Sequence, residues 1–308
     1  MTSIFTAFTQ AGPVTRTEFP ECSLTVSKHF VQSSSLRKTL IAAYRAYARA
    51  QVWRRGPRIL VNSIPKAGTH LLTAELERLA DLQNSRLHLD IDRLGMPGTS
   101  NDLGFPMVNL PKTERAISTV RPGQMFSAHL YWSKELEDIL SGAEICSIFI
   151  ARDPRDIVLS RLHYAMGLRR HRLHPYLAEV LENDKDRLRS LIVGRDADPF
   201  IRPLRATLQG YLPWLDRPGT LAVRFEDLVG QRGGGTAERK RDALRSIVDL
   251  CGIDGSKVDE MAGIGTGPTP TMRKGKAGGW RDEMPAELVE LCDAEMGDLI
   301  EAYGYART

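Results

Sequence analysis

Short apolar runs alternate along the chain with segments of helical periodicity. The apolar runs cover residues 59–61, 124–130, 144–151 and 220–228, and each precedes a segment whose apolar positions recur at roughly helical spacing. The run at 144–151 is continuous, as in a strand that is buried on both faces of a parallel sheet. The alternation predicts an α/β fold with a central parallel sheet flanked by helices.

The first 57 residues do not follow this pattern. Residues 1–34 have weak periodicity, whereas residues 36–53 have one apolar helical face that is surrounded by lysines and arginines. That face consists of Leu36, Leu40, Tyr44 and Tyr47. We expect residues 1–57 to form an N-terminal arm and a basic amphipathic helix, packed on a single α/β domain that spans residues 58–308.

The chain of 308 residues is mildly basic, with a formal net charge of +4 and a pI near 8.9. Residues 22–74 contain nine lysines or arginines and no aspartate or glutamate. This segment predicts a basic wall beside an anion site, a peripheral contact with an anionic membrane surface or glycan, or a solvated helix face. The net charge is too small to indicate a nucleic-acid partner.

Four cysteines, at positions 22, 146, 251 and 292, show no C-x-x-C spacing. We therefore expect neither a zinc site nor a disulfide framework. A reducing, cytoplasmic location is expected for the protein. No apolar run approaches the roughly 18 residues of a membrane span, and the N-terminus lacks the basic and apolar regions of a secretory leader.

The most informative stretch is residues 58–72, where a short strand, a polar turn and a helix start follow one another. The N-terminus of a helix holds phosphate or sulfate through its backbone N–H groups and its positive dipole end. Lys66, Gly68 and Thr69 supply a cation, a close backbone approach and a hydroxyl at this turn. The turn is P-loop-like, but the P-loop pattern requires an earlier glycine and a lysine after the last one.

Three other segments carry candidate chemistry. Arg152 ends the continuous apolar run, and Ser160 lies two turns along the helix that Asp153 can cap, so both can reach one phosphate. Residues 272–280 form a basic, glycine-rich stretch, which is a further phosphate loop or a disordered linker. His129 ends the run at 124–130, where an imidazole is either a general base or a structural residue.

These segments resemble the cytosolic-type sulfotransferases, which use 3′-phosphoadenosine 5′-phosphosulfate (PAPS). In this family the phosphosulfate loop has the motif P-K-x-G-T, which matches residues 65–69. The helix that binds the 3′-phosphate has the motif R-[ND]-P-[KR]-D-x-x-x-S, which matches residues 152–160. Its C-terminal R-K-G-x-x-G-x-W matches residues 273–280. The three motifs stand in the family's order and at its usual separations, and the matched framework covers residues 58–295. The chain is identified as a member of this family.

The resemblance implies a role for each matched residue. His129 aligns with the general base, and Lys66 with the group that stabilises the departing nucleotide; no metal is implied. His70, within the loop, is a rival for the base or a further phosphosulfate ligand. The nucleotide ligands implied are Lys66, Ala67, Gly68, Thr69, His70, Leu71, Arg152, Ser160, Phe225, Arg273, Lys274 and Gly275.

The chain departs from the family at several of these positions. Leu71 replaces the tryptophan that stacks on adenine, Ser127 replaces a lysine two residues before His129, and Phe225 replaces a tyrosine. The family's C-terminal dimer motif is poorly matched near residues 281–290, so the family's dimer is not assumed and the oligomeric state stays open. Which residue packs against the adenine ring therefore stays open.

The expected activity is transfer of a sulfuryl group from PAPS to a hydroxyl or amine of a small metabolite, lipid or carbohydrate, with 3′-phosphoadenosine 5′-phosphate (PAP) as product. Residues 90–112, rich in glycine and proline, suggest a substrate-facing loop, and the basic cluster at 168–174 lines the acceptor side or is an exposed charge run. Two alternatives stay open. One is a nucleotide-dependent kinase, disfavoured because the Walker lysine and an acidic magnesium pair are missing; the other is a nucleotide- or nucleic-acid-binding protein without catalysis.

Overall fold

The computed structural model describes residues 39, 42, 56–80, 82–96, 98–100, 105–264 and 276–308. The chain divides into two units, residues 1–47 and 48–308. The expected arm and basic helix at 1–57 lie almost entirely outside the described residues, so their structure and packing stay predictions. Within the described ranges, no helix combines the length and apolarity needed to cross a bilayer.

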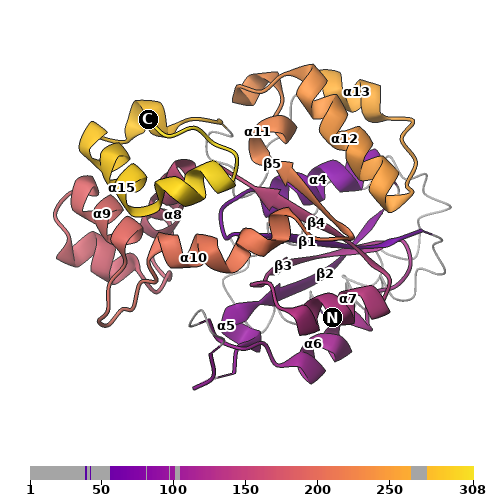
Figure 1. Ribbon diagram of the computed structural model, residues 1–308, viewed down its shortest axis with the longest axis horizontal. Coiled ribbons are helices and arrows are strands. Elements are labelled where there is room, and N and C mark those ends of the chain that lie inside the picture. Colours follow the sequence, from indigo (N-terminus) through magenta and orange to yellow (C-terminus); the bar gives the residue numbers. More distant parts are fainter. Residues whose placement is uncertain are drawn as a thin grey trace, which may run out of the picture. The chain divides into compact units, whose positions relative to one another are not determined.

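In the described part of the chain, five strands form one sheet in the order β2-β3-β1-β4-β5, and every neighbouring pair is parallel. The strands are β1 (Arg58–Ser63), β2 (Gln83–Asp90), β3 (Gln124–His129), β4 (Ile145–Ala151) and β5 (Thr220–Arg224). Because β1 pairs with both β3 and β4, the carboxyl ends of these three strands meet at one edge of the sheet (Figure 1). The predicted central parallel sheet is confirmed.

Side chains alternate between the two faces of the sheet along each central strand. Ile59 and Val61 of β1 pack in one hydrophobic cluster, and Leu60 packs in the other. In β4, Ile148 joins the first cluster and Phe149 the second. Both faces of the sheet are therefore apolar, and both need a cover of helices.

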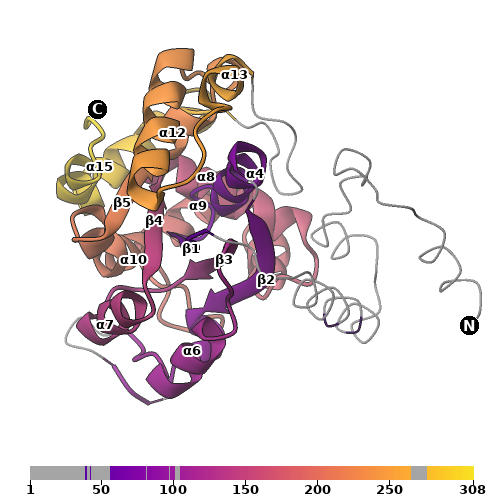
Figure 2. The ribbon, with the colours of Figure 1, turned by 90° about the vertical axis from the view of Figure 1, so that its right-hand side faces the viewer.

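Helices cover both faces of the sheet, as Figures 1 and 2 show. The Ile59 side is covered by α4 (Thr69–Leu79), α11 (Phe225–Leu228), α12 (Ala237–Cys251) and α13 (Val258–Gly263). The Leu60 cluster includes residues of α6 (Leu110–Ile117), α7 (Lys134–Gly142), α8 (Pro154–Gly167), α9 (Asp184–Val193), α10 (Leu204–Tyr211) and α15 (Ala286–Ala302). Shorter elements are α5 (Ile91–Leu94), α14 (Trp280–Glu283), a π-helical turn Tyr176–Val180, and the 3-10 turns Leu212–Leu215 and Gln231–Gly233.

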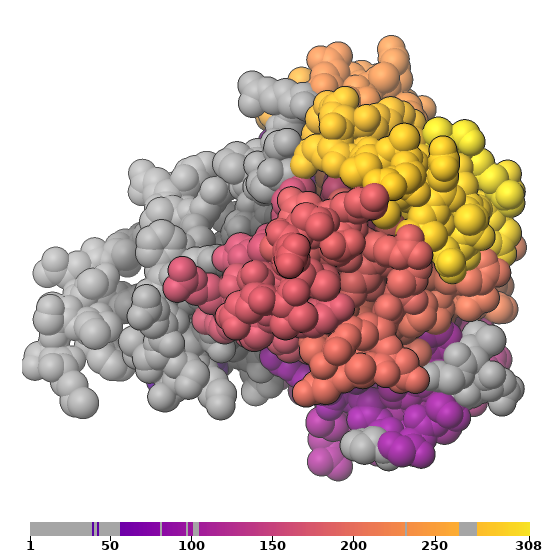
Figure 3. Space-filling model, turned by 90° about the vertical axis from the view of Figure 1, so that its left-hand side faces the viewer, coloured from indigo at the N-terminus to yellow at the C-terminus, as the bar shows by residue number. Residues whose placement is uncertain are grey.

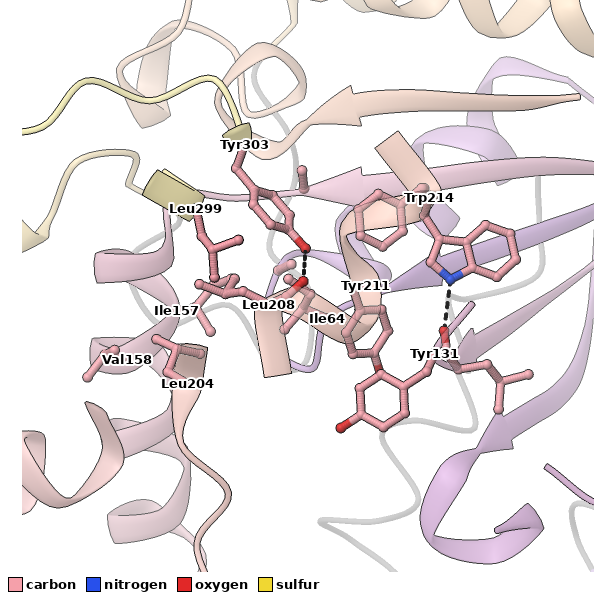
Figure 4. Close-up of a cluster of buried hydrophobic side chains, with 14 of the residues drawn as sticks. Ile64, Tyr131, Ile157, Val158, Leu204, Leu208, Tyr211, Trp214, Leu299 and Tyr303 are labelled. Carbon is pink, nitrogen blue, oxygen red and sulfur yellow. Dashed lines mark hydrogen bonds between the residues drawn. The ribbon is translucent and has the colours of Figure 1, made fainter. Parts of the chain in front are cut away.

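Buried aromatic residues tie the 3-10 turn Leu212–Leu215 to the end of β3, and the end of α15 to α10 (Figure 4). The Trp214 indole N–H donates to the Leu130 carbonyl at 3.0 Å, and the Tyr303 hydroxyl donates to the Leu208 carbonyl at 2.8 Å. Each ring thus buries apolar surface while its polar group is satisfied. In the space-filling view the C-terminal segment lies directly against the segment around α9 (Figure 3).

Three expectations from the sequence are corrected by the structure. The strand expected at 220–228 ends at Arg224, and Phe225–Leu228 form the short helix α11. Residues 83–90, for which no strand was expected, form β2 at the edge of the sheet. Cys146 and Cys251 form a disulfide, with their Cα atoms 5.9 Å apart. The expectation of no disulfide was wrong because β4 and α12 pack together although 105 residues separate the two cysteines.

Candidate active site

The turn between β1 and α4 has a backbone that requires glycine at position 68. The Gly68 φ of 121° lies in the left-handed region. A Cβ atom added there would lie 2.8 Å from the Phe225 ring and 2.9 Å from Ile150, closer than real Cβ contacts. Lys66, with φ of 79°, is also left-handed, and the Ala67 N–H closes the turn on the Ile64 carbonyl at 3.0 Å. Phe225 therefore supports the loop from behind.

The N-terminus of α4 is open to an anion. No side-chain hydrogen bond caps this helix, and its first turn holds no acidic residue. In contrast, α6, α7, α9 and α12 each have a side chain that caps their first turn. Leu71, 2% exposed, points into the core, which leaves only its backbone to the site, whereas the His70 side chain is exposed. The start of α4 is thus suited to a phosphate or sulfate.

His129 is joined to this turn through Ser63. The His129 Nδ1 atom lies 2.9 Å from the Ser63 carbonyl oxygen and 3.3 Å from Ser63 Oγ, and Ser63 Oγ lies 2.6 Å from Thr69 Oγ1. A carbonyl oxygen only accepts hydrogen bonds, so Nδ1 carries the proton of the neutral ring. This tautomer leaves the basic lone pair on Nε2. Ser63 could not be identified from the sequence, because its contact with His129 depends on β1 and β3 being neighbours.

Lys66 lies against Tyr164 of α8, with its Nζ atom 4.0 Å from the centre of the ring. Burial first, and then the charge of Arg152, lower the pKa of Lys66 from 10.5 to about 8. A desolvated cation beside a second cation gains much from an anion placed between them. Tyr164 could not be singled out from the sequence.

Arg152 connects the turn with the C-terminal segment. Its guanidinium donates to the carbonyls of Lys66 at 3.4 Å and Lys276 at 3.2 Å, and lies 4.2 Å from the centre of the Phe225 ring. Its Nε atom is buried and has no hydrogen-bond partner among the described residues. An orphaned N–H on a buried cation fits a bound phosphate. Ser160 lies two turns along α8 and is partly exposed.

Asp156 holds the second half of the predicted C-terminal motif, residues 276–280. Its two carboxylate oxygens accept the backbone N–H groups of Gly278 at 2.8 Å and Trp280 at 3.0 Å, and one lies 3.6 Å from Arg152. Arg273, Lys274 and Gly275 lie outside the described residues, so their placement stays a prediction. The described residues that follow them lie beside Arg152.

Behind Asp156, a buried network fixes the start of α8. Asp153 caps the helix and pairs with Arg155 at 2.9 Å, and the Trp280 indole donates to the same carboxylate at 3.0 Å. The Asp153 N–H donates to Glu226, which also accepts the Tyr305 hydroxyl at 2.7 Å. The aspartates belong to the motif read from the sequence, whereas the Tyr305 contact was not foreseen.

Comparisons with known proteins give the same family as the motifs. A family described as "Sulfotransferase domain" matches residues 56–304. The crystal structure of mouse sulfotransferase SULT7A1 complexed with PAP is similar with a TM-score of 0.51 and 17% identity, over 83% of this chain and 91% of that chain. A structure of retinol dehydratase in a complex with retinol and PAP has a TM-score of 0.43 and 19% identity, over 81% and 82%. No curated protein matches the chain.

Proposed function

Because the chain belongs to the sulfotransferase family, we propose that it transfers a sulfuryl group from PAPS to a hydroxyl or amine of a small metabolite, lipid or carbohydrate. The bond between sulfur and the acceptor oxygen or nitrogen forms as the bond between sulfur and the 5′-phosphate oxygen breaks. PAP leaves, and the acceptor proton passes to the protein. Mouse sulfotransferase SULT7A1, which has a similar structure, is complexed with PAP, which is consistent with such a site.

The donor nucleotide fits the cationic turn. Bound PAPS supplies the sulfuryl group, and the N–H groups at the start of α4 are suited to its 5′ end. Arg152, with its orphaned Nε, and Ser160 are proposed for the 3′-phosphate, together with Arg273, Lys274 and Gly275. Lys66 stabilises the negative charge that develops on the 5′-phosphate oxygen of the leaving group.

His129 is proposed as the general base. Its Nδ1 proton is held by the Ser63 carbonyl, so the opposite nitrogen accepts the proton of the attacking hydroxyl. Ser63 also holds Thr69, so the base and the turn are fixed to each other. Such positioning provides much of the rate in transfers whose attacking and leaving atoms are in line. The His70 side chain lies on the exposed side of α4.

The observation that carries the proposal is the hydrogen-bonded connection from Thr69 through Ser63 to His129, beside a lysine with a lowered pKa. The test is a screen in which PAPS with labelled sulfate is incubated with the full chain and cell extracts. We expect label in an organic product with the natural chain and none with Lys66→Met. PAP binding measured by calorimetry accompanies the screen. Absence of PAP binding would contradict the proposal.

A further inference from the structure

Arg161 of α8 is a cation that has no acidic partner among the described residues. It follows Ser160 and is partly buried. Its guanidinium makes no ion pair or hydrogen bond to a described residue. Tyr164, three residues later on the same helix face, carries Lys66 on its ring. Arg161 therefore belongs to the helix face that contacts the reaction site.

Tyr131 supplies a second polar group near Arg161. Tyr131 follows His129 by two residues, and its hydroxyl has no hydrogen bond to a described residue. Its ring lies 4.2 Å from Phe105 and 4.8 Å from Tyr211, between centres, which fixes its position. Burial raises the pKa of Tyr131, while the charges of Arg202 and Arg161 lower it. The Tyr131 hydroxyl and the Arg161 guanidinium thus lie within electrostatic reach of each other.

Further cations lie near Tyr131 and Arg161. Arg172 is held by a hydrogen bond from Nη1 to the Phe200 carbonyl at 2.8 Å, and Arg202 lies over the Phe105 ring at 5.1 Å. His171 packs edge-on against Tyr164 at 5.5 Å. Burial first, and then the charges of Arg172, Arg161 and Lys66, lower the pKa of His171. The charges of Asp92 and Asp90 raise the pKa of Tyr131, and their effect is smaller than that of the two arginines.

We propose that Arg161 and the Tyr131 hydroxyl bind an anionic group of the acceptor, a carboxylate or a phosphate or sulfate ester, and so select acidic acceptors. The inference rests on the proposed function and narrows its substrate class. An arginine offers a planar set of donors that suits each of these groups, and a desolvated one gains more from pairing than an exposed one. Arg161 acts as a specificity residue, since His129 and Lys66 carry the transfer.

The test measures binding of matched acid and methyl-ester probes to the full chain, with and without PAP. The probes are aromatic hydroxyl compounds, 4-hydroxybenzoate and 3-(4-hydroxyphenyl)propanoate with their methyl esters, and an aryl phosphate with its diester. We expect at least one acid to bind the natural chain about tenfold or more tightly than its ester. Arg161→Met should abolish this ratio, and Arg161→Lys should keep part of it. Arg169→Met, an exposed arginine of the neighbouring cluster, is the control and should leave the ratio unchanged.

The outcomes separate this inference from the proposed function. PAP affinity should be the same in Arg161→Met as in the natural chain, within about threefold. Equal binding of every acid and its ester, or a ratio that survives Arg161→Met, would overturn the inference. A weaker PAP affinity in Arg161→Met would also overturn it, because it would place Arg161 in the nucleotide site. Failure of the natural chain to bind PAP counts against the proposed function alone, since the probe ratio is also measured without PAP.

Discussion

Replacing Lys66 by methionine should stabilise the protein without nucleotide while removing its activity. Lys66 remains charged at neutral pH although burial and Arg152 lower its pKa from 10.5 to about 8. At about 1.4 kcal/mol per pH unit, keeping the charge in the folded state costs about 3 kcal/mol. The contact with the Tyr164 ring returns about 0.5–2 kcal/mol, so Lys66→Met should gain about 1–2.5 kcal/mol of stability.

The stability gain of Lys66→Met should decrease as the pH rises above 8. Because the pKa of Lys66 is lower in the folded state, the unfolded chain binds more protons between pH 8 and 10.5. The destabilisation is therefore fully present below pH 8, and it is lost as the pH rises toward 10.5. The advantage of Lys66→Met over the natural chain should shrink across this interval.

Reversible urea unfolding at neutral pH and near pH 10, followed by tryptophan fluorescence with the disulfide in the same state, measures the effect. Lys66→Arg is the control that retains the charge, and it should show no gain at neutral pH. A Lys66→Met variant that is less stable than the natural chain, or a difference independent of pH, would refute the reasoning. Turnover of Lys66→Met is expected to be lost in either case.

Two further predictions concern the start of α8. Arg155→Met should destabilise the protein by about 3 kcal/mol, because it leaves the Asp153 carboxylate buried without its cation. The control Arg205→Met breaks an exposed ion pair and should leave the urea midpoint unchanged. Equal urea midpoints for the two variants would contradict this prediction. Asp156→Asn keeps one acceptor oxygen where two are used, and should weaken PAP binding about tenfold or more in calorimetry. Unchanged PAP affinity would show that Asp156 does not position the C-terminal motif, residues 273–280, for the nucleotide.

The sequence predicted the central strands because their apolar runs are continuous, but it missed the edge strand. In β2 only two apolar residues, Leu87 and Leu89, alternate with polar ones, and the pairing with β3 shifts register between Asn84 and His88. Edge strands are stabilised by their neighbour more than by their own pattern. The Phe225–Leu228 segment was misassigned because its apolar ends suited a strand, whereas the chain turns into a helix there.

At the site, the motifs located the ligands within each segment, and the fold supplied the connections between segments. Glycine at position 68 was expected for a close backbone approach, and the structure adds Phe225 and Ile150 as the residues that enforce it. Ser63 and Tyr164 could not be predicted, because their roles follow from the neighbouring strands and from packing of α8 on the turn. The disulfide is a similar case, since spacing along the chain does not report packing of β4 on α12.

The most direct measurement of the central claim is turnover of His129→Ala with PAPS, together with its affinity for PAP. A general base contributes about a hundredfold or more, so the variant should lose at least that factor in transfer. PAP affinity should stay within about threefold of the natural chain, because no proposed nucleotide ligand is removed. Normal turnover in His129→Ala would contradict the account, whereas lost turnover with intact PAP binding is the result that it predicts.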